Sequence, residues 1–241
     1  MLKITKRYYS ATKYSQKQEL PKEGEIPLSW RRIFYKSYSR LASKKLSPTE
    51  PEKDFSLEGI MHQRETTRKF SENPLSFANV SNLLVHSAGI SLFYKAREKR
   101  VYPSAGARYP IEMYFVSNNI EELDKGIYHY NIKRNSVERL LESVKCEQIK
   151  EIIIQPDLRI PPALFILTAV LSRSDIKYGE NAYRFALIES GHIGQNIYLL
   201  CEKYGLGCCA IGGFDNDILS KIIDLTEEEI PLYLIGVGNK P

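Results

Sequence analysis

The chain has 241 residues, 43% of them hydrophobic and 26% charged, which suffices for one large domain with a proper core. Its longest apolar run, Ala163–Leu171, is too short to span a bilayer, and the N-terminus lacks the apolar core of a secretory signal. These features exclude a membrane-spanning protein and predict a cytoplasmic location. The net charge of +5 is unevenly placed, because residues 1–45 carry twelve Lys/Arg and three Asp/Glu.

This basic segment indicates an anionic partner or, alternatively, an extension that lies over a neighbouring subunit. No Arg-aromatic recognition motif supports nucleic acid, so we expect none. The Pro- and charge-rich run PTEPEKD at Pro48–Asp54 is the clearest boundary signal. We therefore predict a basic arm and linker at residues 1–54 and a folded domain at residues 55–241. The four cysteines and four histidines lack metal-ligand spacing, so no metal site is expected.

Hydrophobic periodicity beyond the linker predicts a mixture of helices and strands. Helices are predicted at Phe55–Glu65 with Asp54 or Ser56 as cap, from Ser76 up to Gly89, at Asn181–Tyr204 and at Asp217–Ile223. Strands are predicted at Ile111–Val116, at Gly126–Tyr130 with a turn at Asn131–Asn135 into SVERLL, at Ala163–Leu171 and at Pro231–Val237. Helices interleaved with a hairpin favour an α+β domain over a doubly wound sheet.

The string GLGCCA at Gly205–Ala210 matches the dinucleotide-binding fingerprint, but its context does not fit. That fingerprint needs a strand before it and a helix opening on it. Here it follows the predicted long helix, so Gly205 is better explained as the glycine that ends this helix. Nicotinamide binding on a Rossmann unit is therefore not supported.

Two other segments contain residues that suit a flat, phosphorylated ligand. In QRETTRKF, Arg64, Thr66 and Arg68 occupy alternate positions, so an extended chain would turn all three toward one phosphate. In YPSAGARYP, starting at Tyr102, small residues let a flat ring approach the main chain and Ser104 supplies a hydroxyl. The alternatives are a solvated basic turn for the first segment and a tight turn into a strand for the second.

In their order along the chain, these segments resemble the nitroreductase superfamily, specifically its SagB-type FMN-dependent dehydrogenases, which include thiazoline and oxazoline oxidases of the ThcOx and McbC kind. The resemblance runs from about Tyr35 to the end. It includes GIYHY at Gly126–Tyr130, YRFALIESGHIGQN from Tyr183 and AIGGF at Ala210–Phe214. It implies an α+β nitroreductase-like fold, with a central mixed or antiparallel sheet flanked by helices. It also implies an intertwined homodimer with two FMN sites at its interface.

The resemblance also implies roles for single residues. The phosphate and ribityl side of FMN would be held by Arg64, Thr66, Arg68 and Lys240, with threonine in place of the commoner serine. The flavin ring would be framed by Pro103, Ser104, Ala105, Gly106 and Arg108 from the other subunit, and by Ile211, Gly212 and Gly213, whose loop turns a main-chain N–H toward N5.

The pair Lys177–Tyr178 narrows the expected reaction. It matches the Lys-Tyr pair to which azoline-oxidising members of the family owe proton abstraction. Aromatising an azoline removes a proton from one ring carbon and a hydride from the next, so a base is required, whereas nitro or quinone reduction needs none. The alternative is an exposed lysine and a packed tyrosine at a helix start. Asn181 stands where family members commonly carry arginine, and this loss of charge would either alter substrate or leader-peptide contacts or weaken the polarisation of the Lys-Tyr pair.

The sequence therefore predicts an FMN-dependent oxidase or dehydrogenase that converts thiazoline or oxazoline rings to azoles in a ribosomally made modified peptide. The expected partners are a second copy of the chain, the leader of the peptide substrate and a cyclodehydratase, which the basic arm would dock. Two alternatives stay open. One is an NAD(P)H-dependent nitro or quinone reductase, and the other is a non-catalytic scaffold subunit of a peptide-modifying complex.

Overall fold

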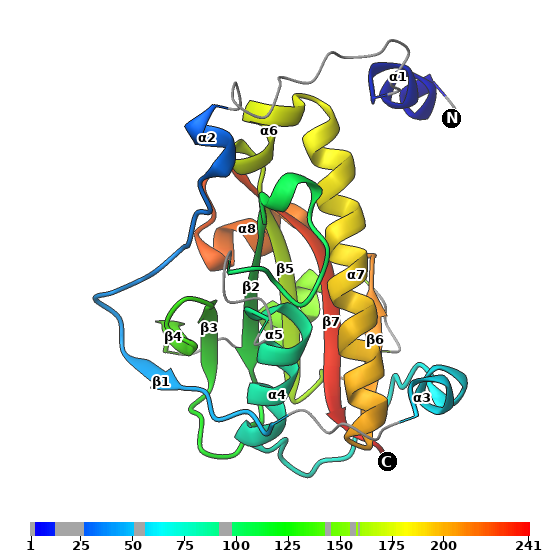
Figure 1. Ribbon diagram of the computed structural model, residues 1–241. Helices are drawn as coiled ribbons and strands as arrows, with labels where there is room; N and C mark the ends of the chain where they lie inside the picture. The colour runs from blue at the N-terminus through cyan, green and yellow to red at the C-terminus, as the bar shows by residue number, and fades with distance from the viewer. Residues whose placement is uncertain are drawn as a thin grey trace.

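The computed structural model describes residues 3–12, 27–50, 56–91, 98–142, 146–154, 158 and 160–241. A seven-stranded sheet forms its centre, in the order β1-β4-β3-β2-β5-β7-β6, with every neighbouring pair antiparallel (Figure 1). The strands are β1 (Ser43–Lys45), β2 (Ile111–Ser117), β3 (Gly126–Asn131), β4 (Ser136–Leu141), β5 (Ala163–Val170), β6 (Leu206–Ile211) and β7 (Glu229–Asn239).

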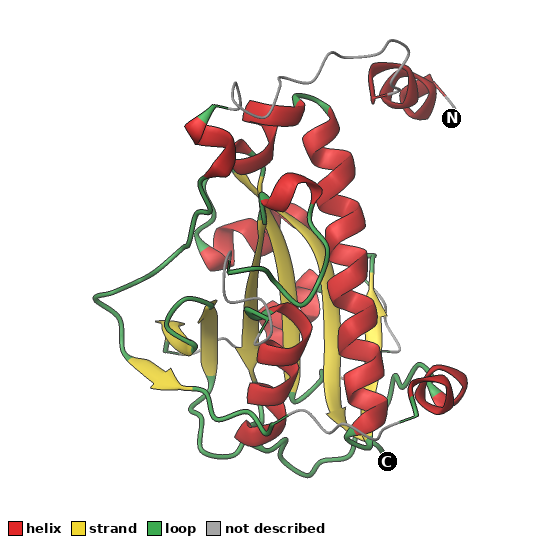
Figure 2. Ribbon diagram, in the orientation of Figure 1, coloured by secondary structure: helices red, strands yellow, loops and turns green. Residues whose placement is uncertain are grey.

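Helices cover both faces of this sheet. They are α1 (Lys3–Thr12), α2 (Leu28–Arg31), α3 (Leu57–Gln63), α4 (Phe77–Ala88), α5 (Cys146–Ile152), α6 (Ser172–Tyr178), α7 (Asn181–Lys203) and α8 (Asn216–Ile223), with a 3₁₀ turn at Ala105–Ala107. The long helix α7 runs along one face beside α4, while α5 and α8 lie behind the sheet (Figures 1 and 2). No helix within the described ranges is long and apolar enough to cross a membrane.

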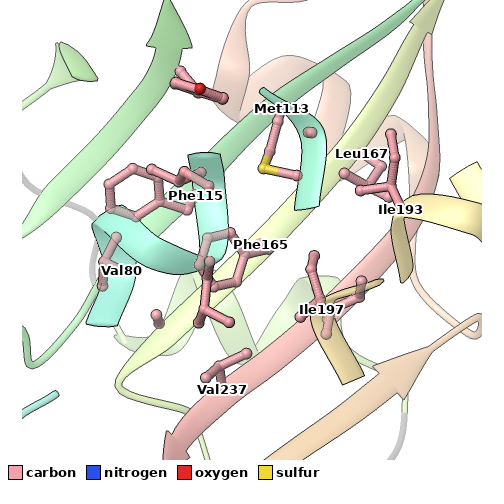
Figure 3. Close-up of a cluster of buried hydrophobic side chains, with 14 of the residues drawn as sticks. Val80, Met113, Phe115, Phe165, Leu167, Ile193, Ile197 and Val237 are labelled. Carbon is pink, nitrogen blue, oxygen red and sulfur yellow. The ribbon is translucent and has the colours of Figure 1, made fainter. Parts of the chain in front are cut away.

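Alternation along the central strands produces two apolar layers. On β2, Met113 and Phe115 belong to the layer under α4 and α7, while Tyr114 and Val116 belong to the layer facing α5 and α8. Figure 3 shows the first layer, where side chains of β2, β5 and β7 meet those of α4 and α7. Because both faces of β2 and β5 are covered, these strands read as nearly continuous apolar runs.

The helix ends follow the predicted capping signals. Ser56 caps α3, where its Oγ accepts from Gly59 N–H at 3.1 Å, and Ser76 caps α4 in the same way. Gly205, at φ +66°, follows the end of α7, which confirms that it is a helix-terminating glycine. The false fingerprint at Gly205–Ala210 follows helix α7 and continues into strand β6, so the order of elements is the reverse of the strand-then-helix order that dinucleotide binding needs.

Part of the predicted N-terminal arm belongs to the sheet. β1 pairs with β4, and Leu46 is buried in the core. Between α2 and β1, Lys36 forms an ion pair with Glu229, and the Tyr38 N–H donates to Glu138 at 2.8 Å. The boundary predicted at residue 54, with the alternative cap Asp54, lies outside the described residues. The predicted division into an arm (residues 1–54) and a domain (residues 55–241) therefore stays a prediction. Strand β1 of the central sheet falls within the predicted arm.

Candidate functional site

The turn at residues 103–109 is fastened to α7 by one carboxyl group. Ser104 Oγ donates to Glu189 Oε1 at 2.7 Å, and the Ala105 N–H donates to the same oxygen at 3.2 Å. Ser104 Oγ in turn accepts from the Tyr109 N–H at 2.9 Å. The backbone is left-handed at Gly106 (φ +57°), and both Gly106 and Pro103 are exposed. The outer side of this turn therefore exposes main-chain atoms, which a flat ligand can approach closely.

Glu189 itself is only 2% exposed, and its Oε2 is buried with no hydrogen-bond partner among the described residues. Burial raises the pKa of Glu189 to about 7, although the hydrogen bonds from Ser104 and Ala105 act in the opposite direction. The sequence placed Glu189 on a helix but gave it no role. The feature of the sequence that could have identified Glu189 is an acidic residue beside small residues in the middle of a predicted helix.

Lys177 and Tyr178 end α6 rather than begin a helix, and both are half-buried. A Cβ built on Gly106 would collide with Tyr178 Oη and lie 2.8 Å from Lys177 Nζ. The structure therefore brings the predicted base pair against the predicted ring-lining turn within one chain. The positive φ favours glycine at position 106, and any larger residue would also make the ends of the Tyr178 and Lys177 side chains shift.

A second group gathers at the other end of α7. A hollow of about 530 Å³ is lined by Glu65, Thr66, Thr67, Arg68, Lys69, Lys240 and Pro241. Lys240 Nζ lies 3.1 Å from Glu202 Oε2 and 3.6 Å from Glu65 Oε1, so two carboxylates partly offset its charge. The hydrogen bond to Glu202 is the main cause that raises the pKa of Lys240.

The segment around Thr66 packs against β6 and Tyr198. All five residues from Glu65 to Lys69 line the hollow, and Thr67 also packs on β6, where a Cβ on Gly207 would lie 2.7 Å from Thr67 Cγ2. The Arg64 guanidinium lies over the ring of Tyr198, 5.3 Å from its centroid. Arg64 and Thr66 therefore both contact Tyr198, and the expectation that Arg68 shares their side stays a prediction.

Tyr198, which the sequence analysis missed, joins this group to the loop after β6. Its hydroxyl lies 3.2 Å from Thr66 Oγ1 and accepts from the Ala210 N–H at 2.9 Å. Ile211 is buried, while a Cβ built on Gly212 or Gly213 would meet nothing within 4 Å. The loop thus presents open space over its two glycines.

Arg108 has a different environment from the one predicted for it. Its side chain is buried and donates to three backbone carbonyls, those of Arg173 at 2.6 Å, Ser29 at 2.9 Å and Arg32 at 3.1 Å. These contacts tie α2 to α6 and give no support to a cofactor contact by the guanidinium. Asn181 begins α7, and its Oδ1 is buried without a partner in the described part of the chain.

Comparisons with known proteins agree with this architecture. The model of the nitroreductase family matches residues 61–239. This chain belongs to the nitroreductase family. The α+β nitroreductase-like fold expected from the sequence is confirmed, and the family consists of oxidoreductases that generally bind flavin.

This nitroreductase-family chain has relatives of two kinds. It is 31% identical over 188 residues to MJ1384 of Methanocaldococcus jannaschii, whose name places it among nitroreductases, covering 78% of this chain and 92% of that one. It is also 26% identical to McbC, the microcin B17-processing protein of Escherichia coli, over 70% of this chain but 64% of McbC. The E. coli microcin synthetase McbBCD complex with truncated pro-MccB17 bound has the same fold, with a TM-score of 0.63 at 24% identity over 80% of this chain and 76% of that one.

Proposed function

We propose that this protein is an FMN-dependent oxidoreductase that dehydrogenates azoline rings of a modified peptide, with Lys177 and Tyr178 handling the proton. The observation that carries the proposal is the convergence of both side chains on Gly106, in the turn held by Glu189. A base beside the ligand-lining turn is needed to oxidise a C–H bond next to a ring nitrogen or sulfur. A reductase of nitro groups or quinones does not need a general base at this position.

The residues present fit FMN in two respects. Arg68, Lys240 and Thr66 surround a hollow with cationic and hydroxyl donors suited to a phosphate. The unfilled space over Gly212 and Gly213 leaves room for a flat ring, and the turn at Pro103 and Gly106 is exposed, although Tyr178 and Lys177 cover one side of Gly106. When bound, FMN would supply the two-electron acceptor that an azoline oxidation requires.

In this proposal the protein's own side chains place the substrate and move its proton. Tyr178 Oη and Lys177 Nζ both lie beside Gly106, so whichever of the two groups has given up its own proton can accept one released there. Glu189 fixes the main chain of the turn through its hydrogen bonds with Ser104 and Ala105. These bonds keep Gly106 at a constant position relative to the side chains of Lys177 and Tyr178.

We further propose a homodimer with peptide-processing partners. The two predicted groups contact α7 at Glu189 and at Tyr198, which are separated by about 14 Å along the helix axis. This separation supports sites completed by a second subunit, as the resemblance implies. McbC is named for microcin B17 processing and is part of a complex with truncated pro-MccB17 bound, which supports a peptide substrate and protein partners for this chain. The net positive charge of residues 1–45 is the ground for proposing that this segment docks a cyclodehydratase.

The test uses the FMN-loaded protein under anaerobic conditions, mixed with either a thiazoline-containing peptide or NADPH. Bleaching of the flavin absorbance by the peptide supports the oxidase, and its loss by about 10²–10⁴-fold in K177Q and Y178F supports the base role. Lys203→Gln, at the far end of α7, is the matched control and should keep the wild-type rate. Full bleaching rates in K177Q and Y178F would refute the base role.

A plain reductase remains the second candidate, because MJ1384 is named among nitroreductases and covers more of this chain than McbC does. In that case NADPH alone would bleach the flavin, and K177Q would react as fast as the wild type. A scaffold subunit would respond to neither reagent. The same pair of additions therefore separates all three functions.

A further inference from the structure

The short helix α2 lies beside α6 at one end of the molecule (Figure 1). It carries Trp30, the single tryptophan of the chain. Lys177 Nζ lies 5.2 Å from the centroid of the Trp30 ring and also 5.2 Å from that of its neighbour Tyr178. The lysine ammonium group is therefore in contact range of two aromatic faces, and indole is the ring that attracts a cation most strongly.

A buried arginine holds α2 in this place. Arg108 donates to the carbonyls of Ser29 and Arg32, which flank Trp30 along the chain, and to the carbonyl of Arg173 on α6. The Arg32 guanidinium also lies over the ring of Phe34, 5.0 Å from its centroid. The position of Trp30 is thus fixed from both sides of the helical turn that carries it.

We propose that Trp30 is a positioning residue for Lys177. Its ring fixes the direction of a long, flexible side chain, so that the amine stays beside Gly106, where the substrate ring would enter. This inference rests on the proposed function for the role of Lys177, but the contact itself can be tested without any substrate. In this proposal Arg108 has a structural role, because its hydrogen bonds hold the segment that carries Trp30.

The contact is tested by intrinsic fluorescence of the FMN-loaded protein, since Trp30 is the only indole that can emit. We expect K177Q to change the intensity or the maximum of the emission, because it removes the cation from the ring face. Lys203→Gln is the matched control, as Lys203 Nζ lies 5.6 Å from the ring of Tyr204 at the other end of α7. Unchanged emission in K177Q would overturn the proposal.

The positioning role is tested by turnover of the thiazoline peptide. We expect W30A to lower kcat about 10- to 100-fold with little change in KM or in bound FMN, and W30F to recover most of the loss. A W30A enzyme with wild-type kcat would overturn the proposal, as would a W30F enzyme no better than W30A. A thermal melt confirms that each variant is folded, and K177Q tests the contact with Trp30 intact. If the wild type oxidises no azoline but K177Q changes the emission, the proposed function fails and the Trp30–Lys177 contact stands.

Discussion

Glu189 is the residue whose protonation most directly affects the turn at the candidate site. Its pKa is raised from the usual 4.5 to about 7, so the folded protein holds a proton that the unfolded chain releases. The stabilising contribution is therefore complete below pH 4.5 and is lost as the pH rises through 7. The full loss amounts to about 3 kcal/mol of unfolding free energy for a group this deeply buried.

E189Q keeps the shape and the acceptor oxygen of Glu189 but does not titrate. We expect the wild type to lose stability between pH 5 and pH 8 by about 2–3 kcal/mol more than E189Q does. Urea unfolding of both proteins at the two pH values measures this difference. Parallel pH dependence in the two proteins would show that Glu189 is not the titrating group.

Gly106 combines a backbone requirement with a steric one, and the two can be separated. G106A must accept φ +57° and a collision with Tyr178 Oη, whereas G205A must accept φ +66° with nothing within 4 Å of the new methyl group. We expect G205A to cost about 1 kcal/mol of unfolding free energy and G106A about 2–3 kcal/mol, with loss of azoline turnover. Equal costs for the two variants, measured by urea unfolding, would mean that Tyr178 moves aside freely.

At the scale of elements, a buried charged cluster joins neighbouring strands. His129 Nε2 on β3 lies 2.9 Å from Glu112 Oε2 on β2, and His129 Nδ1 lies 3.2 Å from Glu138 Oε2 on β4. Burial alone would lower the pKa of His129, but its hydrogen bonds to the two carboxylates raise it overall. Burial would raise the pKa of Glu112, yet hydrogen bonding to His129 and the charge of Arg173 lower it to about 2.

H129L leaves two buried carboxylates without the cation between them. We expect it to lose about 3 kcal/mol of unfolding free energy at pH 7, because the buried Glu138 loses its cationic partner while Glu112 keeps Arg173 at 2.6 Å. His192 is exposed on α7, so H192L serves as the control and should change stability by less than about 0.5 kcal/mol. Thermal and urea unfolding measure both, and similar stability of the two variants would contradict this account of the cluster.

Elements with local signals could be predicted from the sequence, and elements defined by their neighbours could not. The capping serines of α3 and α4 and the hairpin of β3 and β4 carry their own turn chemistry. By contrast, β1 reads SKK and is a strand only because it pairs with β4, and the short β6 depends on β7. The amphipathic alternation that marks a strand is absent from both.

The same distinction applies to the site. The local motif around Ser104 identified the turn, but the carboxyl group that holds it is 85 residues away on α7. Trp30 and Tyr198 belong to the site for the same tertiary reason, because only the fold brings them to Lys177 and Thr66. Arg108 shows the reverse case, since its place in the motif predicts a position beside the cofactor, whereas only the fold reveals that its side chain holds three backbone carbonyls.

At the scale of the whole molecule, α6 and α7 expose apolar side chains on one surface, which α1 covers only in part, where the rings of Tyr8 and Tyr183 lie 5.9 Å apart. Tyr183, Leu187 and Ile188 on α7 are 39%, 40% and 50% exposed, and Ile176 on α6 is 54% exposed. Beside them, a hollow of about 710 Å³ is lined in part by Leu171, Gly179 and Tyr183. Apolar side chains gathered on one long helix are typical of a subunit interface, so we expect a homodimer through this surface.

The double variant L187E/I188E introduces like charges into this expected interface, where each would face its counterpart across the two-fold axis. We expect the wild type to migrate as a dimer and the variant as a monomer in size-exclusion chromatography with light scattering. Because the flavin sites are expected to need both subunits, the monomer should also lose most of its bound FMN. Leu141→Glu, which charges a side chain 40% exposed on β4, should leave the dimer and its FMN intact. A wild-type monomer that retains FMN would show that one chain completes the site alone, and the separation of the two groups along α7 would then reflect the length of the bound flavin.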